Sequence, residues 1–144
     1  MENFSANFIK RKGMVFLMTY EIMNTILVER LPEVKDAVRK ETSHWKYEEV
    51  PSHVLYEVAL NQSGFMYGLL LEDSNKSLIE KVFVFFEEMA SCDDREVRNL
   101  LQVSILEYLW GDFQVLSRAH KYMHPKTRIL SDELQIYFKP FKPT

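Results

Sequence analysis

Five carboxylates gather within a short stretch of this sequence, and their charge could attract a partner. They are Glu87, Glu88, Asp93, Asp94 and Glu96. Arg95 is the only opposing charge between the first and the last of them. Because Coulomb attraction speeds the association of oppositely charged surfaces, this group predicts a surface that binds a basic partner. The competing interpretation is structural, since acidic residues are common where helices begin.

A second kind of chemistry, metal binding, is suggested by Glu41 and His44, which stand three residues apart. Di-iron helical bundles use this Glu-x-x-His element twice, together with a glutamate from each of two further helices. Glu21 and Glu57 could supply such glutamates, but the element occurs once in this chain. Chance spacing on a solvated surface is therefore the favoured interpretation, and we expect no metal.

The other reactive side chains do not form a catalytic pattern. His120 and His124 are four residues apart but lack the intervening glutamate of zinc-protease helices. Cys92 precedes two aspartates, whose charge opposes thiolate formation, and Ser104 lies in an apolar run, where a hydroxyl usually bonds the helix backbone. The sequence also has no glycine-rich phosphate loop and no paired Cys-x-x-Cys elements. We expect a protein that is not an enzyme and has no cofactor.

Helices must position these residues, because apolar side chains recur at intervals of three and four along most of the chain. With 4 Gly and 5 Pro in 144 residues, the sequence has too few turn signals for an all-β fold. Asp93 or Asp94 and Asp112 are predicted helix caps, as is Ser52. The predicted helices cover residues 14–31, 32–42, 52–61, 65–71, 78–89, 97–109, 113–122 and 131–138, with 65–71 either separate or a kinked continuation.

About six or seven helices with short connections predict an all-α fold, either a single-domain bundle or a solenoid-like stack of antiparallel pairs. No repeat of fixed period is visible. We expect a loose N-terminal arm over residues 1–13, one helical domain over residues 14–139 and an extended tail over residues 140–144. Residues 43–50 are predicted to form a loop in which Trp45 is an aromatic anchor.

The composition also bears on the compartment and on the class of partner. Cys92 is the only cysteine, which favours a reducing cytoplasm, and no apolar stretch approaches the ~20 residues that span a bilayer. Residues 1–117 carry a net charge of −7 and residues 118–144 one of +4, within a total of −3. The basic end could meet phosphate, but the acidic total makes nucleic acid an unfavoured partner.

The second half of the chain resembles a family of small all-helical bacterial proteins associated with immunity to polymorphic or contact-dependent toxins. The resemblance rests on FVFFEEMASCDDREVRNLLQVSILE at residues 83–107 and HPKTRILS at residues 124–131. Its most specific parts are the Phe-x-Glu-x-Met-Ala core and the run from Asn99 to Glu107. His124 departs from the pattern, because a glycine is expected before the Pro-x-Thr-Arg element.

The resemblance implies a non-catalytic immunity protein that binds and inhibits a cognate protein toxin domain. The acidic group described above is the expected interface, because a toxin that cleaves nucleic acid is often basic. Two alternatives remain open. One is a small metal-binding helical enzyme that uses Glu41 and His44; the other is an oligomeric scaffold or regulatory protein held by exposed aromatics such as Trp45 or Trp110.

Overall fold

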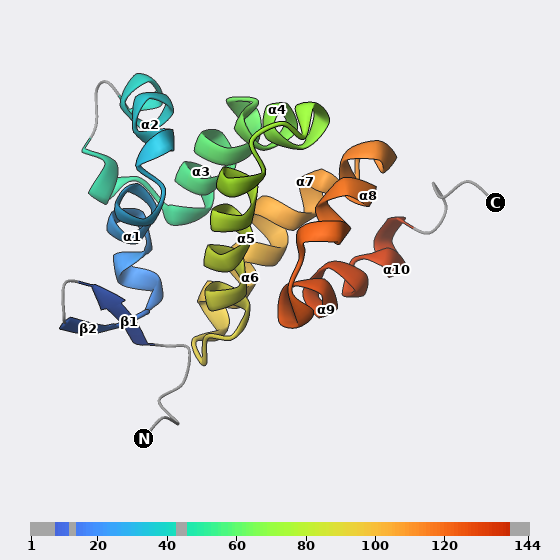
Figure 1. Cartoon of the computed structure of the whole chain (residues 1–144). Coiled ribbons are helices and arrows are strands. Elements are labelled where there is room, and N and C mark those ends of the chain that lie inside the picture. The colour runs from blue at the N-terminus through green and yellow to red at the C-terminus, as the bar shows by residue number, and fades with distance from the viewer. Residues whose placement is uncertain (1–7, 12–13, 43–45, 139–144) are drawn as a thin grey trace.

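Helices form almost the whole of the computed structural model, which describes residues 8–11, 14–42 and 46–138 (Figure 1). The strands are β1 (Phe8–Arg11) and β2 (Met14–Leu17). The α-helices are α1 (Met23–Arg30), α2 (Lys35–Glu41), α3 (Ser52–Tyr56), α4 (Phe65–Glu72), α5 (Lys76–Ala90), α6 (Arg95–Leu101), α7 (Glu107–Leu109), α8 (Phe113–Tyr122), α9 (Pro125–Glu133) and α10 (Gln135–Phe138). Short 3-10 turns are η1 (Tyr20–Ile22), η2 (Pro32–Val34) and η3 (Tyr47–Glu49). This architecture confirms the predicted all-α single-domain bundle.

Helix α5 is the centre of the bundle, and α6, α8 and α9 pack against it (Figure 1). It begins where the Asn75 side chain accepts a hydrogen bond from the backbone N–H of Leu78 at 3.2 Å. Its apolar residues recur at helical spacing, and Val82, Phe83 and Phe86 are fully buried. The helix predicted over residues 78–89 is therefore confirmed. Its far end leads directly into the acidic group.

The helix predicted over residues 14–31 is wrong in its first part. Residues 14–17 form β2, which pairs antiparallel with β1, and the α-helix begins only at Met23. The sequence Met-Val-Phe-Leu contains a β-branched and an aromatic residue, and so short an apolar run is equally compatible with a strand. Residues 8–11 of the predicted arm are β1, whereas the rest of that arm and the tail over residues 140–144 lie outside the described residues.

The predicted start of the last helix and one predicted cap are also wrong. The helix predicted over residues 113–122 is confirmed as α8, but the next helix, α9, begins at Pro125, because a fixed φ and a missing N–H are tolerated at the first helical position. Ser131, the predicted start of a helix, is therefore a buried residue inside α9. Ser52 does not cap α3, because its hydroxyl instead donates to Oδ1 of Asn24 at 2.7 Å. The caps predicted at Asp94 and Asp112 are confirmed.

Two π-helical turns face each other inside the bundle. Helix α3 continues into η4 (Glu57–Gln62), and α6 continues through η5 (Gln102–Leu106) into α7. The Asn61 amide of η4 donates to the carbonyls of Ser104 at 2.9 Å and Ile105 at 3.3 Å, both in η5. Its carbonyl oxygen, Oδ1, has no hydrogen-bond partner within the described part of the chain. One buried amide thus joins the two irregular turns.

A helix that crosses a bilayer needs about 20 predominantly apolar residues. Across the residues that the structure describes, none of the helices combines enough length with enough apolar character to cross a membrane.

Candidate binding surface at the acidic turn

The acidic turn, residues 87–96, joins the end of α5 to the start of α6 and lies at the lower end of the bundle in Figure 1. Glu87 is directed across it to α9. Its Oε1 accepts hydrogen bonds from the backbone N–H and the hydroxyl of Thr127, both at 2.9 Å, and its Oε2 accepts from the backbone N–H of Lys126 at 3.0 Å. A carboxylate of α5 therefore caps the N-terminus of α9, where amides lack partners within their own helix.

Glu88 connects α5 to α1. Its two carboxylate oxygens contact the two terminal nitrogens of the Arg30 guanidinium, one at 3.2 Å and the other in the Arg30–Glu88 ion pair. The guanidinium also lies over the Phe85 ring, 5.4 Å from its centroid. Both charged side chains are partly shielded from solvent, so this bidentate pair stabilises the packing of the two helices more than an exposed pair would.

Asp94 holds two segments at once. Its Oδ1 accepts from the backbone N–H of Glu96 at 2.9 Å and so caps α6, as the sequence predicted. Its Oδ2 accepts from the backbone N–H of Tyr20 at 2.9 Å, which fixes the start of η1 against the turn. Beside it, the buried Cys92 thiol donates to the carbonyl of Met18 at 3.2 Å.

We expect Cys92 to be unreactive in the folded protein. Burial, followed by the charges of Asp94 and Asp93, raises the pKa of the Cys92 thiol, in the direction that the sequence predicted. Alkylation by iodoacetamide at pH 8 should be at least about tenfold slower in buffer than in denaturant, because it requires local opening. Mass spectrometry of quenched samples measures both rates. Equal rates would show that this turn is open in solution.

Asp93 and Glu96 differ from the other three carboxylates because their side chains are exposed. The structure thus divides the five predicted interface residues. Asp94 caps its own helix, α6, and Glu87 and Glu88 bond residues of other helices. These three carboxylates therefore have structural roles. For Asp93 and Glu96 a role in partner binding remains a prediction.

The carboxylates considered for a di-iron centre do not come together among the described residues. His44 and the side chain of Glu41 lie outside those residues. Glu57 accepts hydrogen bonds from the Tyr108 hydroxyl and from Nε2 of Gln62, and Glu21 is exposed in η1. In the described ranges, no three His, Cys, Asp or Glu side chains are close enough to hold a metal ion.

His120 and His124 have different surroundings. Nε2 of His120 is hydrogen-bonded to Oγ of Ser131 at 3.1 Å, and its ring meets the Trp110 ring edge-on. Burial, with a smaller contribution from the charge of Arg128, lowers the pKa of His120, so its imidazole is neutral at pH 7. His124 is exposed immediately before α9. Trp110, expected to be exposed, is half-buried and donates to Ser131 at 3.1 Å, whereas Trp45 lies outside the described residues.

One pair with catalytic residue types was missed from the sequence. Nδ1 of His53 and Oγ of Ser104 are hydrogen-bonded at 2.6 Å, the spacing of a base and a nucleophile. Ser104 is only 3% exposed, so a substrate cannot reach its hydroxyl. The pair lies 51 positions apart in the chain, and no local spacing could have revealed it. We interpret it as a structural bond between α3 and η5.

Fold and surface together define the class of this protein: a small all-α domain in which an acidic turn joins two central helices. The chain belongs to the family described as Domain of unknown function (DUF7674), which matches residues 24–138. The matched region begins in α1 and ends with α10, so it includes nearly all of the helical bundle but not the β1–β2 hairpin. Neither the curated proteins nor the solved structures gave a match.

Proposed function

We propose that this chain is a non-catalytic binding protein, and specifically an immunity protein that binds and inhibits a cognate bacterial toxin domain. The observation that carries the proposal is the construction of the acidic turn. Glu87, Glu88 and Asp94 fix its backbone against three other segments, while Asp93 and Glu96 remain exposed. A surface held rigid before binding loses little conformational entropy on association.

The charges around the turn favour a basic partner. Glu21 is exposed next to Tyr20, whose backbone N–H is bonded to Asp94, so it adds a third exposed carboxylate at this end of the bundle. Arg95 and Lys126 are exposed beside them. Mixed charges of this kind give a partner one preferred orientation, and the acidic excess speeds its approach.

The test is a double charge reversal, Asp93→Lys with Glu96→Lys, compared with the wild type. The matched control is Glu72→Lys with Glu80→Lys, which changes the net charge equally at exposed positions toward the other end of α5. Against a toxin domain captured from the source cells, we expect the first variant to associate about tenfold more slowly at low ionic strength. The control should associate at nearly the wild-type rate, and salt should reduce the difference.

The same variants test immunity in cells. The captured domain should stop growth when it is expressed alone, and co-expression of the wild type or the control should restore growth. Partial or no rescue by the Asp93 and Glu96 variant would support the proposal. A captured domain that is harmless, or equal association rates for both variants, would contradict it. Variants of Glu88 or Asp94 are unsuitable, because they would break the Arg30 pair or the cap of α6.

A further inference from the structure

Within the described part of the chain, helix α10 is attached to the bundle mainly through one aromatic ring (Figure 1). None of its residues is buried, and Ile136 and Tyr137 are each 71% exposed. Phe138 packs against the core, where its ring stacks on Trp110 with centroids 5.7 Å apart. Leu134, immediately before α10, is buried. The attachment of α10 therefore depends on the position of the Trp110 ring, and α10 can open without the rest of the bundle.

A buried hydroxyl positions the Trp110 ring and is shared with a histidine. The Trp110 N–H donates to Oγ of Ser131 at 3.1 Å, and Nε2 of His120 is hydrogen-bonded to the same oxygen at 3.1 Å. Ser131 is fully buried. Because an indole N–H can only donate, Oγ accepts from Trp110, and the hydroxyl hydrogen is available to the neutral Nε2 of His120. One hydroxyl of α9 thus joins His120 of α8 to the ring that holds α10.

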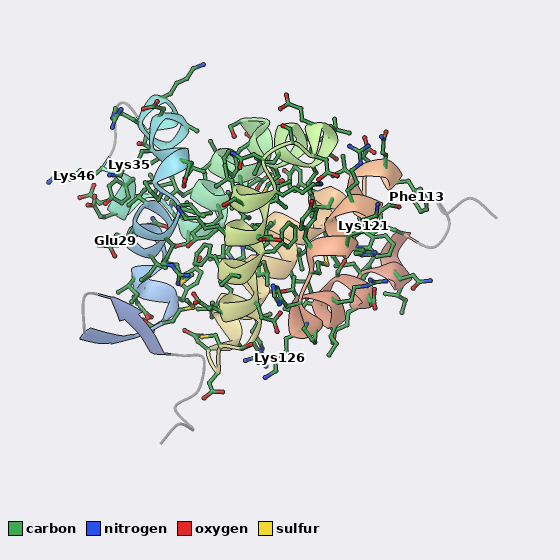
Figure 2. All side chains as sticks on the ribbon, in the orientation of Figure 1. Glu29, Lys35, Lys46, Phe113, Lys121 and Lys126 are labelled. Carbon is green, nitrogen blue, oxygen red and sulfur yellow. The ribbon has the colours of Figure 1, made fainter. Side chains whose placement is uncertain are left out.

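The charges around His120 do not provide it with a carboxylate of its own. Among the described residues, the charged groups that act on its ring are Arg128 and Asp132 of α9. Arg128 disfavours the protonated imidazole and Asp132 favours it, and the two form an ion pair with each other at 2.9 Å. The turn before α8 and helix α10 contribute uncharged aromatic rings. Lys121, the next residue of α8, is exposed (Figure 2).

We propose that His120 is a pH-sensitive switch for the attachment of α10: its protonation breaks the Ser131 bridge and releases α10 from Trp110, while the rest of the bundle stays folded. Both ring nitrogens of a protonated imidazole are donors, so Nε2 no longer accepts from Ser131. It donates to Oγ instead. Because a charged donor forms the stronger hydrogen bond, it displaces the Trp110 N–H. The Trp110 ring then moves, and Phe138 loses the surface on which it stacks.

The switch opens on the acid side. Burial, ahead of the charge of Arg128, lowers the pKa of His120 while α10 is attached. A histidine in water has a pKa of about 6.5. Release of α10 exposes the imidazole, so the open form binds a proton more readily than the closed form. The equilibrium therefore shifts toward the open form as the pH falls below about 6.5, and the shift is complete below the lowered pKa.

The experiment uses the full chain with Trp45→Phe, which leaves Trp110 as the sole tryptophan. Its fluorescence emission and the far-UV circular dichroism are recorded from pH 8 to pH 5. We expect the emission to move to longer wavelength, with a midpoint below about 6.5, while most of the helical signal remains. His120→Gln, which cannot be protonated, should abolish this shift. The matched control His124→Gln, at an exposed position before α9, should retain it.

Hydrogen exchange separates release of α10 from a change confined to the indole. The amide of Tyr137 donates to the carbonyl of Leu134 at 2.9 Å, and a released helix of four residues cannot protect it. At pH 5.5 this amide should exchange at least about fivefold faster in the wild type than in His120→Gln, whereas at pH 7.5 the two rates should agree. Comparison at one pH removes the intrinsic pH dependence of exchange.

Four results would overturn the proposal: no emission shift in the wild type, an equal shift in His120→Gln, equal exchange of the Tyr137 amide at pH 5.5, or loss of the whole helical signal with the shift. Circular dichroism at pH 7.5 checks that His120→Gln folds. Phe138→Ala is a second, independent variant and should leave the Tyr137 amide unprotected already at pH 8. Protection that persists in Phe138→Ala would equally overturn the proposal. None of these measurements depends on the proposed immunity function.

Discussion

Replacing Asn61 with aspartate is expected to lower the free energy of unfolding by at least about 3 kcal/mol at pH 7. Asn61 is 7% exposed, and its amide N–H groups donate to the carbonyls of Ser104 and Ile105. Aspartate has the same shape but offers oxygen where those carbonyls require a donor. A buried carboxylate would then face two carbonyl oxygens without compensation. Urea unfolding followed by circular dichroism measures the loss.

The loss of stability caused by Asn61→Asp should depend on pH. Burial of the introduced carboxyl determines whether this loss grows or shrinks as the pH falls. Burial raises the pKa of the introduced carboxyl in the folded state above its unfolded value of about 3.9. The loss of stability is therefore complete above the raised pKa. It shrinks as the pH falls toward the pKa of the unfolded state, because the neutral acid can donate to one carbonyl. Asn99→Asp makes the same change at an exposed position of α6 and should stay within about 0.5 kcal/mol of wild type. Similar losses in both variants would contradict the role given to Asn61.

The second large effect is expected for Glu87→Ala, which should destabilise the fold by about 2–4 kcal/mol. The substitution removes the acceptor of three donors, the N–H of Lys126 and the N–H and hydroxyl of Thr127. Thr127 is fully buried, so water cannot replace the carboxylate without opening the start of α9. Urea unfolding measures the stability, and hydrogen exchange should show that the amides of Lys126 and Thr127 lose protection.

Glu87→Ala has a matched control in the same group of acidic residues. Glu96→Ala also removes a carboxylate, but at an exposed position, and should change stability by no more than about 0.5 kcal/mol. Glu87→Gln keeps one oxygen acceptor and should fall between the two. Equal stability of the Glu87→Ala and Glu96→Ala variants would show that α9 begins without help from α5.

The sequence predicts those parts of the fold that depend on residues only a few positions apart in the chain. Asp94 and Asp112 accept from amides two or three positions ahead, so their capping follows from residue type and spacing. The burial of Val82, Phe83 and Phe86 follows from their spacing on one helix. The strand β2 could not be predicted in this way, because an apolar run of four residues fits either period and its pairing depends on β1.

The acidic turn shows why the site was harder to predict than the fold. Glu87 and Thr127 are 40 positions apart, and Glu88 and Arg30 are 58 apart, so neither contact leaves a local signal. The π-helical turns could not be predicted either. The sequence of η5 has the pattern of an ordinary helix, and the hydrogen bond that joins the two turns comes from a distant residue, Asn61 on η4. Charge clustering identified a group of carboxylates, but which of them are exposed is a property of tertiary packing.

Met18 is bonded to Cys92, and Tyr20 is bonded to Asp94. Neither bond can form early in the synthesis of the chain. Each bond spans 74 positions, so the segment between β2 and α1 cannot reach its final partners until the acidic turn has been translated. At typical elongation rates of about 5–20 residues per second, the wait is roughly 4–15 s. Until then the segment that follows the β1–β2 hairpin lacks the two bonds that hold it in the folded protein, and the strand edges of the hairpin can pair with another chain.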